Sequence, residues 1–255
     1  MSAQEEQRVP GTSEEEPLLG RSGDASLEEG KPLYYNLVLG TGVVAQAGVW
    51  IVSPPPSTSQ TVQSANEMFP AHSNSLGRNL QFPSLQLLNS AALLFFIQGT
   101  LILQPTHTAS QKHAGTLTHS ALNNVAVASA LAGLVIIEYN KISHGGTHFV
   151  STHAILGLTV YILTSVQAFV GLTQFFTPAL YGGKENARKL YKYHRVSGYV
   201  VLALMLATVA AATSTDFNKN VLGMQLWAVV AASVITVVGI APRIRLSKFG
   251  WLAGK

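Results

Sequence analysis

The sequence predicts an all-α membrane protein, a bundle of six transmembrane helices. Only 11% of the 255 residues are charged, whereas about 25% are charged in soluble domains. Hydrophobic residues make up 47% of the chain, even though its N-terminal tail is strongly polar. Six apolar runs have close to the roughly 20 residues that cross a bilayer as a helix. These runs are residues 33–52, 85–103, 117–139, 153–175, 193–213 and 221–240.

The six runs define a central domain, residues 33–240, between two tails. The first run ends shortly before the proline stretch 54–56, which predicts a stiff loop, and the second is the shortest. The third, fourth and fifth runs each carry a histidine in their first turn, and the sixth leads into a basic tail. That basic tail is residues 241–255.

The N-terminal tail, residues 1–32, is acidic and rich in Gly and Ser, so we expect it to be disordered. It lacks the apolar core of a signal peptide. Glu14, Leu18 and Leu19 fit an acidic dileucine sorting signal, which adaptor proteins would read on a cytosolic tail. This pattern predicts delivery to a vacuole, a lysosome or another endomembrane.

Lys and Arg residues set the expected orientation, because they gather on the cytosolic side of membrane proteins. Three of the sixteen fall on one side, namely Arg78, Lys141 and Lys219, and the other thirteen fall on the side that holds both termini. Both termini are therefore predicted to be cytosolic. Membrane topology also explains the pI of about 9.3, so we expect a lipid bilayer and no nucleic acid as partner.

Three of the eight histidines, His119, His153 and His194, lie at the first turn of long apolar runs. An ionisable residue in a bilayer is costly and usually functional, and a neutral imidazole is an axial ligand for haem iron. The chain has no cysteine, so any haem is held noncovalently. His119 and His194 belong to one level near the cytosolic face, and His153 lies near the opposite face. Two metal sites at these levels would conduct electrons across the membrane.

Two stretches and one histidine carry a resemblance to a known family. Residues 148–157 read His-Phe-Val-Ser-Thr-His-Ala-Ile-Leu-Gly and are followed by Gln167 and Gly171, and residues 190–199 read Leu-Tyr-Lys-Tyr-His-Arg-Val-Ser-Gly-Tyr. Together they resemble the helix-4 and helix-5 signatures of the cytochrome b561 family, in particular its single-domain members. His119, followed by Gly133 and the pair Glu138-Tyr139, fits a third ligand position. The resemblance covers roughly residues 80–240.

The resemblance implies a four-helix haem-binding core, helices 2–5, that holds two haems b. His119, His153 and His194 are then the metal ligands. It also implies an enzyme that moves electrons from cytosolic ascorbate to an acceptor across the membrane, either monodehydroascorbate or ferric iron. A homodimer is a possible assembly.

One position departs from the family pattern, which has a histidine at the start of helix 2. Counting back from Gln98-Gly99 leads to Gln86, which offers an amide in place of an imidazole. Three explanations stay open: the second haem is lost, it is rebuilt with His72, or residues 74–84 are an artefact of a misassigned exon boundary. The alternative function that follows is a haem-poor or mono-haem member that acts as a membrane sensor or scaffold. Asn123 and Asn140 also replace histidines that many members carry.

Residues near the two faces are candidates for substrate binding. On the cytosolic side they are Lys112, Arg188, Lys192 and Arg195, which either report topology and contact lipid phosphates or hold an anionic enediol such as ascorbate by charge-assisted hydrogen bonds. On the opposite face His148 is the candidate for binding iron or another acceptor, with His144 beside it. A flavin-linked ferric reductase is excluded, because it needs paired histidines about fourteen residues apart on each of two helices.

Overall fold

The computed structural model describes residues 75–103, 109–143 and 145–241, without the side chains of 75–86, 109–111 and 221. All of the regular structure in these residues is helical, as the sequence predicted. The α-helices are α3 (Ser75–Ile102), α4 (Ala109–Ser143), α5 (Thr152–Phe176), α6 (Lys184–Ala212) and α7 (Leu226–Ile240). A short 3-10 helix, η1 (Pro178–Tyr181), precedes α6, and a π-helical turn, η2 (Asn218–Leu222), precedes α7.

Helix positions agree with the sequence analysis, while several helix ends do not. The apolar runs predicted from residues 85 and 193 begin inside longer helices, since α3 begins at Ser75 and α6 begins at Lys184. Both extensions are more polar than the apolar runs, so they could not be read from hydropathy. The last helix begins late, at Leu226, because Gly223 adopts a left-handed conformation with φ of 66° and separates it from η2. The predicted helix 33–52, the whole N-terminal tail and residues 242–255 of the C-terminal tail lie outside the described residues.

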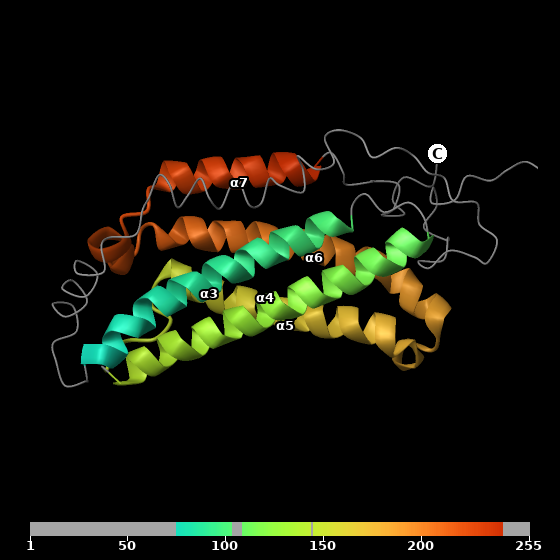
Figure 1. Ribbon diagram of the computed structural model, residues 1–255, viewed down its shortest axis with the longest axis horizontal. Helices are drawn as coiled ribbons and strands as arrows, with labels where there is room; N and C mark the ends of the chain where they lie inside the picture. The colour runs from blue at the N-terminus through green and yellow to red at the C-terminus, as the bar shows by residue number, and fades with distance from the viewer. Residues whose placement is uncertain (1–74, 104–108, 144, 242–255) are drawn as a thin grey trace, which may run out of the picture.

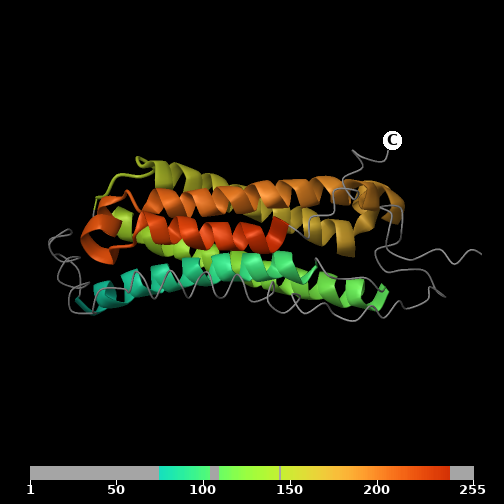
Figure 2. The ribbon, with the colours of Figure 1, turned by 90° about the horizontal axis from the view of Figure 1, so that it is seen from above.

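The helices lie side by side and alternate in direction along the chain (Figure 1). Helix α3 packs mainly against α4, and α5 packs mainly against α6. Contacts of α4 with α5 and of α3 with α6 join these two pairs into a four-helix bundle. Helix α7 runs along α6 on the outside of this bundle, as the view from above also shows (Figure 2).

The lengths and surfaces of these helices fit a membrane. Three segments are long and apolar enough to cross a bilayer: Lys112–Ser143, Thr152–Phe176 and Lys184–Ala212. Two shorter apolar helices, Leu87–Ile102 and Leu226–Ile240, accompany them. The buried core between the helices is small and includes Ala, Leu and Phe side chains, whereas many large apolar side chains face outward. The protein is therefore a multi-pass membrane protein.

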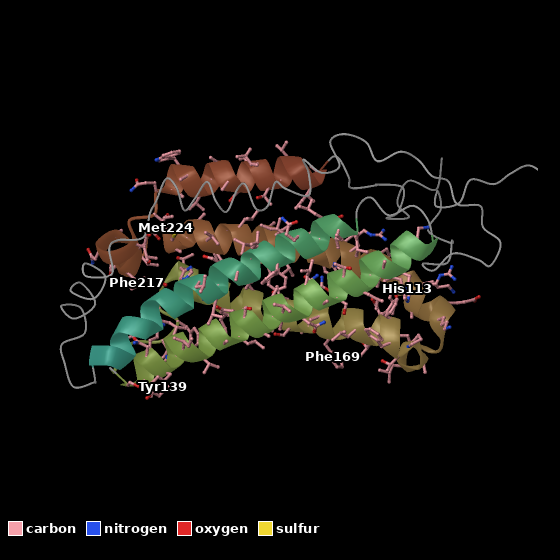
Figure 3. The ribbon with its side chains drawn as sticks, in the orientation of Figure 1. His113, Tyr139, Phe169, Phe217 and Met224 are labelled. Carbon is pink, nitrogen blue, oxygen red and sulfur yellow. The ribbon has the colours of Figure 1, made fainter. Side chains whose placement is uncertain are left out.

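The bundle has two distinct ends (Figure 3). His113, near the start of α4, marks one end, which we call the His113 end. Tyr139, near the end of α4, marks the other, together with Phe217 and Met224 of the turn between α6 and α7. We call this the Tyr139 end. Helices α4 and α6 begin at the His113 end, and α3, α5 and α7 begin at the Tyr139 end.

Candidate functional site

Helices α4 and α6 bring His119 and His194 together inside the bundle. Their ring centroids are 6.5 Å apart, and the ring planes meet at 81°. A metal bound between two imidazoles at about 2.0–2.1 Å from each nitrogen needs ring centroids about 6 Å apart. The observed separation therefore fits two imidazoles that would hold one metal between them.

The surroundings of His119 favour one tautomer of its neutral ring, the one with the proton on Nδ1. His119 Nδ1 lies 2.7 Å from the carbonyl oxygen of Gly99 on α3. A carbonyl only accepts hydrogen bonds, so Nδ1 carries the proton and donates it. Nε2 then keeps its lone pair, and a backbone carbonyl behind the other ring nitrogen is the usual environment of a metal-binding histidine.

Asn123 packs behind the same histidine, one helical turn further along α4. Its Nδ2 donates to the carbonyl oxygen of His119 over 2.7 Å and lies 3.2 Å from His119 Nδ1. Gly99 makes room for this amide, because a Cβ at Gly99 would stand 2.5 Å from Asn123 Nδ2. The absence of a side chain at Gly99 thus lets α3 approach α4 closely enough for its carbonyl to reach the imidazole.

Helix α5 supports His194 from the other side. A Cβ at Gly171 would lie 3.0 Å from His194 Cε1, so the ring packs directly against the backbone of α5. Gln167 Nε2 donates to the carbonyl oxygen of His194 over 3.1 Å and to Ser197 Oγ over 2.8 Å. These contacts fix the position of residue 194 on α6, while Nδ1 of its ring is buried without a hydrogen-bond partner.

Several polar side-chain atoms of the described residues on α3, α5 and α6 are buried without a hydrogen-bond partner. They include His194 Nδ1, Nε2 of Gln98, which adjoins Gly99, and Oε1 of Gln174, one turn beyond Gly171. Buried polar groups without partners are rare and call for an explanation such as a group absent from the coordinates. The residues present therefore fit a polar, metal-containing cofactor between α4 and α6.

His153 lies at the other level. Its Nδ1 is 2.9 Å from the carbonyl oxygen of Thr208 on α6, which again leaves Nε2 with its lone pair. Thr208 follows His194 by fourteen residues on the same helix, so the two levels are about 21 Å apart at 1.5 Å per residue. The structure does not supply a histidine opposite His153 on α3, because Ser75–Ile102 contains none. The side chain of Gln86 and all of His72 lie outside the described residues.

A polar contact that the sequence analysis did not single out lies between the two levels. Tyr161 on α5 donates its hydroxyl hydrogen to Asn89 Oδ1 on α3 over 2.7 Å. Gly133 on α4 accommodates the amide, since a Cβ there would be 2.6 Å from Asn89 Nδ2. The signal in the sequence was a polar residue within an apolar run, but no pattern pairs Asn89 with a tyrosine 72 positions away.

The predicted cytosolic substrate residues lie at the His113 end. Lys112 is half-buried near the start of α4, as are Arg188, Lys192 and Arg195 near the start of α6. The three residues of α6 are spaced at i, i+4 and i+7, so they share one face of that helix. Lys192 Nζ lies 5.3 Å from the centroid of the Tyr193 ring. A line of cations therefore leads from the end of the bundle toward the level of His194.

His148 lies at the Tyr139 end, in the turn between α4 and α5. Its Nδ1 forms a short hydrogen bond with Oε2 of Glu138. The next residue, Phe149, has a positive φ of 52°, and Lys141 Nζ lies 5.8 Å from its ring centroid. Its predicted neighbour His144 lies outside the described residues. Across the described part of the chain, no three His, Cys, Asp or Glu side chains form a metal-binding cluster.

The sequence was compared with models of known protein families and with curated proteins. A family model described as eukaryotic cytochrome b561 matches residues 82–219, a span that contains all three helix-embedded histidines. The search among curated proteins gives no match. Because the family model covers more than half of the sequence, the chain belongs to the eukaryotic cytochrome b561 family.

Proposed function

We propose that this protein is a b-type haem oxidoreductase that carries electrons from cytosolic ascorbate to an acceptor across the membrane. Membership of the cytochrome b561 family implies haem-dependent transmembrane electron transfer in general. The single observation that supports the specific proposal is the facing pair His119 and His194, with ring centroids 6.5 Å apart. The acceptor class is monodehydroascorbate or ferric iron.

The proposed architecture is a six-helix transmembrane bundle whose core is the four helices α3 to α6. The His113 end faces the cytosol, because the Lys and Arg residues of the chain concentrate on that side. Both termini are then cytosolic as well. The acidic dileucine pattern of the N-terminal tail, which lies outside the described residues, supports a vacuolar, lysosomal or other endomembrane location.

His119 and His194 would hold haem b at the cytosolic level. When bound, haem b supplies one-electron redox chemistry, and the protein supplies its binding, orientation and electrostatics. The Gly99 carbonyl keeps the His119 proton on Nδ1, and Gly171 and Gln167 keep residue 194 against α5. With both imidazoles held by the haem, no site would stay open for oxygen, which would favour electron transfer over oxygen binding.

The cationic face of α6 would attract the electron donor. Arg188, Lys192 and Arg195 of α6, together with Lys112 of α4, would form a positive rim that concentrates an anion such as ascorbate. Charge-assisted hydrogen bonds from Lys192 and Arg195 would orient the donor next to His194. At the Tyr139 end, His148 with its partner Glu138 is the proposed acceptor-side group.

The alternative is a mono-haem or haem-poor protein that acts as a membrane sensor or scaffold. One observation favours it: α3 contains no histidine along Ser75–Ile102, so among the described residues this helix offers His153 no imidazole as a second ligand. Gln86 stands at the position where the family places the missing ligand and would at most coordinate weakly. Electron transfer through the membrane would then be interrupted at that level.

Haem stoichiometry distinguishes the two functions. We would measure it by pyridine haemochromogen on the purified protein, together with an ascorbate-reduced difference spectrum. Two haems per chain support transmembrane transfer, one leaves a cytosolic redox site alone, and none contradicts the oxidoreductase. His119→Ala and His194→Ala should each remove the same haem, whereas His113→Ala, an exposed histidine at the same end, should not. If one haem is found, Gln86→His should add the second.

A further inference from the structure

The three helix-embedded histidines differ in the hydrogen-bond partner of Nδ1, the ring nitrogen that faces away from the proposed metal. Nδ1 of His119 and Nδ1 of His153 each meet a backbone carbonyl of a neighbouring helix, at 2.7 and 2.9 Å. Nδ1 of His194 is buried and has no hydrogen-bond partner. A metal-binding histidine almost always donates its second N–H to an acceptor, which fixes the ring and sets its basicity. His194 therefore lacks a contact that the other two possess.

One face of α5 lies against His194. Gln167, Gly171 and Gln174 follow each other at i, i+4 and i+7, so they form a single stripe along the helix. The first member binds the carbonyl oxygen of His194, and the second packs against its ring. The third member, Gln174, is one turn beyond the ring contact on the same stripe.

Gln174 offers the acceptor that His194 lacks. Its side chain is only 3% exposed, and Oε1 is buried without a partner. Among the buried side-chain atoms of the described residues that lack a hydrogen-bond partner, Oε1 of Gln174 is the acceptor, and Nδ1 of His194 is one of several potential donors. Side chains of an α-helix tilt toward its N-terminus, so Gln174 extends back toward Gly171, against which the His194 ring packs.

We propose that Gln174 Oε1 accepts a hydrogen bond from His194 Nδ1–H when His194 binds haem iron, and that Gln174 thereby positions this ligand and tunes the reduction potential of the cytosolic haem. The inference rests on the proposed function, in which His194 is a haem ligand. Gln167 holds the backbone of residue 194, and Gln174 holds its ring. Two glutamines from one helix thus restrain a single histidine.

The chemistry of the acceptor determines the sign of the effect. A neutral amide draws the Nδ1 proton moderately. A carboxylate at this position draws it more strongly and makes the imidazole a better electron donor, which stabilises ferric iron and lowers the potential. An aliphatic side chain removes the hydrogen bond and raises the potential. Because a carboxylate also lowers the potential through its charge alone, the rise with the aliphatic side chain and the infrared signal of Nδ1–H are the readouts specific to the hydrogen bond.

The test is a potentiometric titration of the haem-loaded, full-length protein carrying Gln174→Glu or Gln174→Leu. We expect the potential of the cytosolic haem to fall with Glu and to rise with Leu, each by roughly a tenfold change in the reduction equilibrium, about 59 mV for a one-electron couple. The same substitutions at Gln225, an exposed glutamine at the Tyr139 end, serve as controls and should leave this potential unchanged.

A measurement on the unaltered protein keeps the inference testable if a variant fails to fold. Redox-induced infrared difference spectra contain imidazole ring bands that report whether Nδ1–H is hydrogen-bonded. Bands of hydrogen-bonded Nδ1–H for both ligands of the cytosolic haem support the inference. A free Nδ1–H on His194, or a potential that both Gln174 variants leave unchanged, overturns it. Failure of the proposed function looks different, because the unaltered protein would then lack the haem or keep it after His194→Ala.

Discussion

Replacing Gly99 by alanine is expected to disturb the His119 site through Asn123. The added Cβ would lie 2.5 Å from Asn123 Nδ2 and 3.2 Å from Asn123 Cγ, well inside van der Waals contact. Asn123 has little freedom to move away, because its Nδ2 is held by the carbonyl oxygen of His119 at 2.7 Å. Either this hydrogen bond breaks or α3 shifts away from α4, and the shift lengthens the 2.7 Å contact between Gly99 and His119.

The size of the effect follows from these two costs. Forcing an extra methyl group into a packed interior destabilises by about 1–3 kcal/mol, and losing one hydrogen bond adds about 0.5–1.5 kcal/mol. Disturbing the groups that orient a metal ligand typically lowers metal affinity by about 10–100-fold. Gly99→Ala should therefore lower the free energy of unfolding by a few kcal/mol and reduce haem retention at the His119 level.

A double-mutant cycle separates the clash from other effects. Asn123→Ala removes the side chain that the new methyl group would strike, so the double variant Gly99→Ala with Asn123→Ala should be less destabilised than the sum of the two single variants. We expect a coupling of about 1–3 kcal/mol. The measurements are thermal unfolding in detergent and the haem absorbance per chain. Gly133→Ala, which meets Asn89 instead, is the matched control for a methyl group at another contact of α4.

Additive effects in this cycle would refute the reasoning. They would mean that Gly99 and Asn123 do not share the space that the structure gives them. Loss of haem in Gly133→Ala to the same extent as in Gly99→Ala would also count against it, because the Gly133 contact lies away from the two imidazoles.

Three further predictions follow from single contacts. Gly171→Ala places a Cβ 3.0 Å from His194 Cε1, so it should displace the ring and shift or weaken the reduced absorbance bands; an unchanged spectrum and unchanged haem content would contradict this. Tyr161→Phe removes the 2.7 Å hydrogen bond to Asn89 and should lower the free energy of unfolding by about 0.5–1.5 kcal/mol without changing the haem spectrum, and a loss of haem would show a different role. The double variant Lys192→Ala with Arg195→Ala should slow reduction by ascorbate in stopped-flow assays at low ionic strength, and added salt should shrink the difference because it screens charges that solvent reaches; equal slowing at every salt concentration would argue against electrostatic attraction.

Hydropathy and histidine placement predicted much of the fold and of the candidate site. The apolar runs located α3 to α7, because a membrane span needs a minimum length of apolar sequence whatever it packs against. Hydropathy could not find the polar extensions that begin α3 at Ser75 and α6 at Lys184, since a helix can continue from the apolar region into polar sequence whose hydropathy resembles that of a loop. Residues 184–192 are instead mostly charged and polar residues on the first turns of α6.

The amino-acid sequence by itself determined the membrane class, the order of the helices and the choice of His119, His153 and His194 as candidate ligands. These properties depend on composition and on position along the chain, and both are visible without a fold. Only the tertiary structure decided which group meets each ring: the Gly99 carbonyl for His119, the Thr208 carbonyl for His153 and the face of α5 for His194. Every residue has a backbone carbonyl, so no sequence pattern marks the one that will orient a ligand. Which carbonyl meets a ring depends on how closely the helices pack. Glycines at the helix contacts, such as Gly99, allow that close packing.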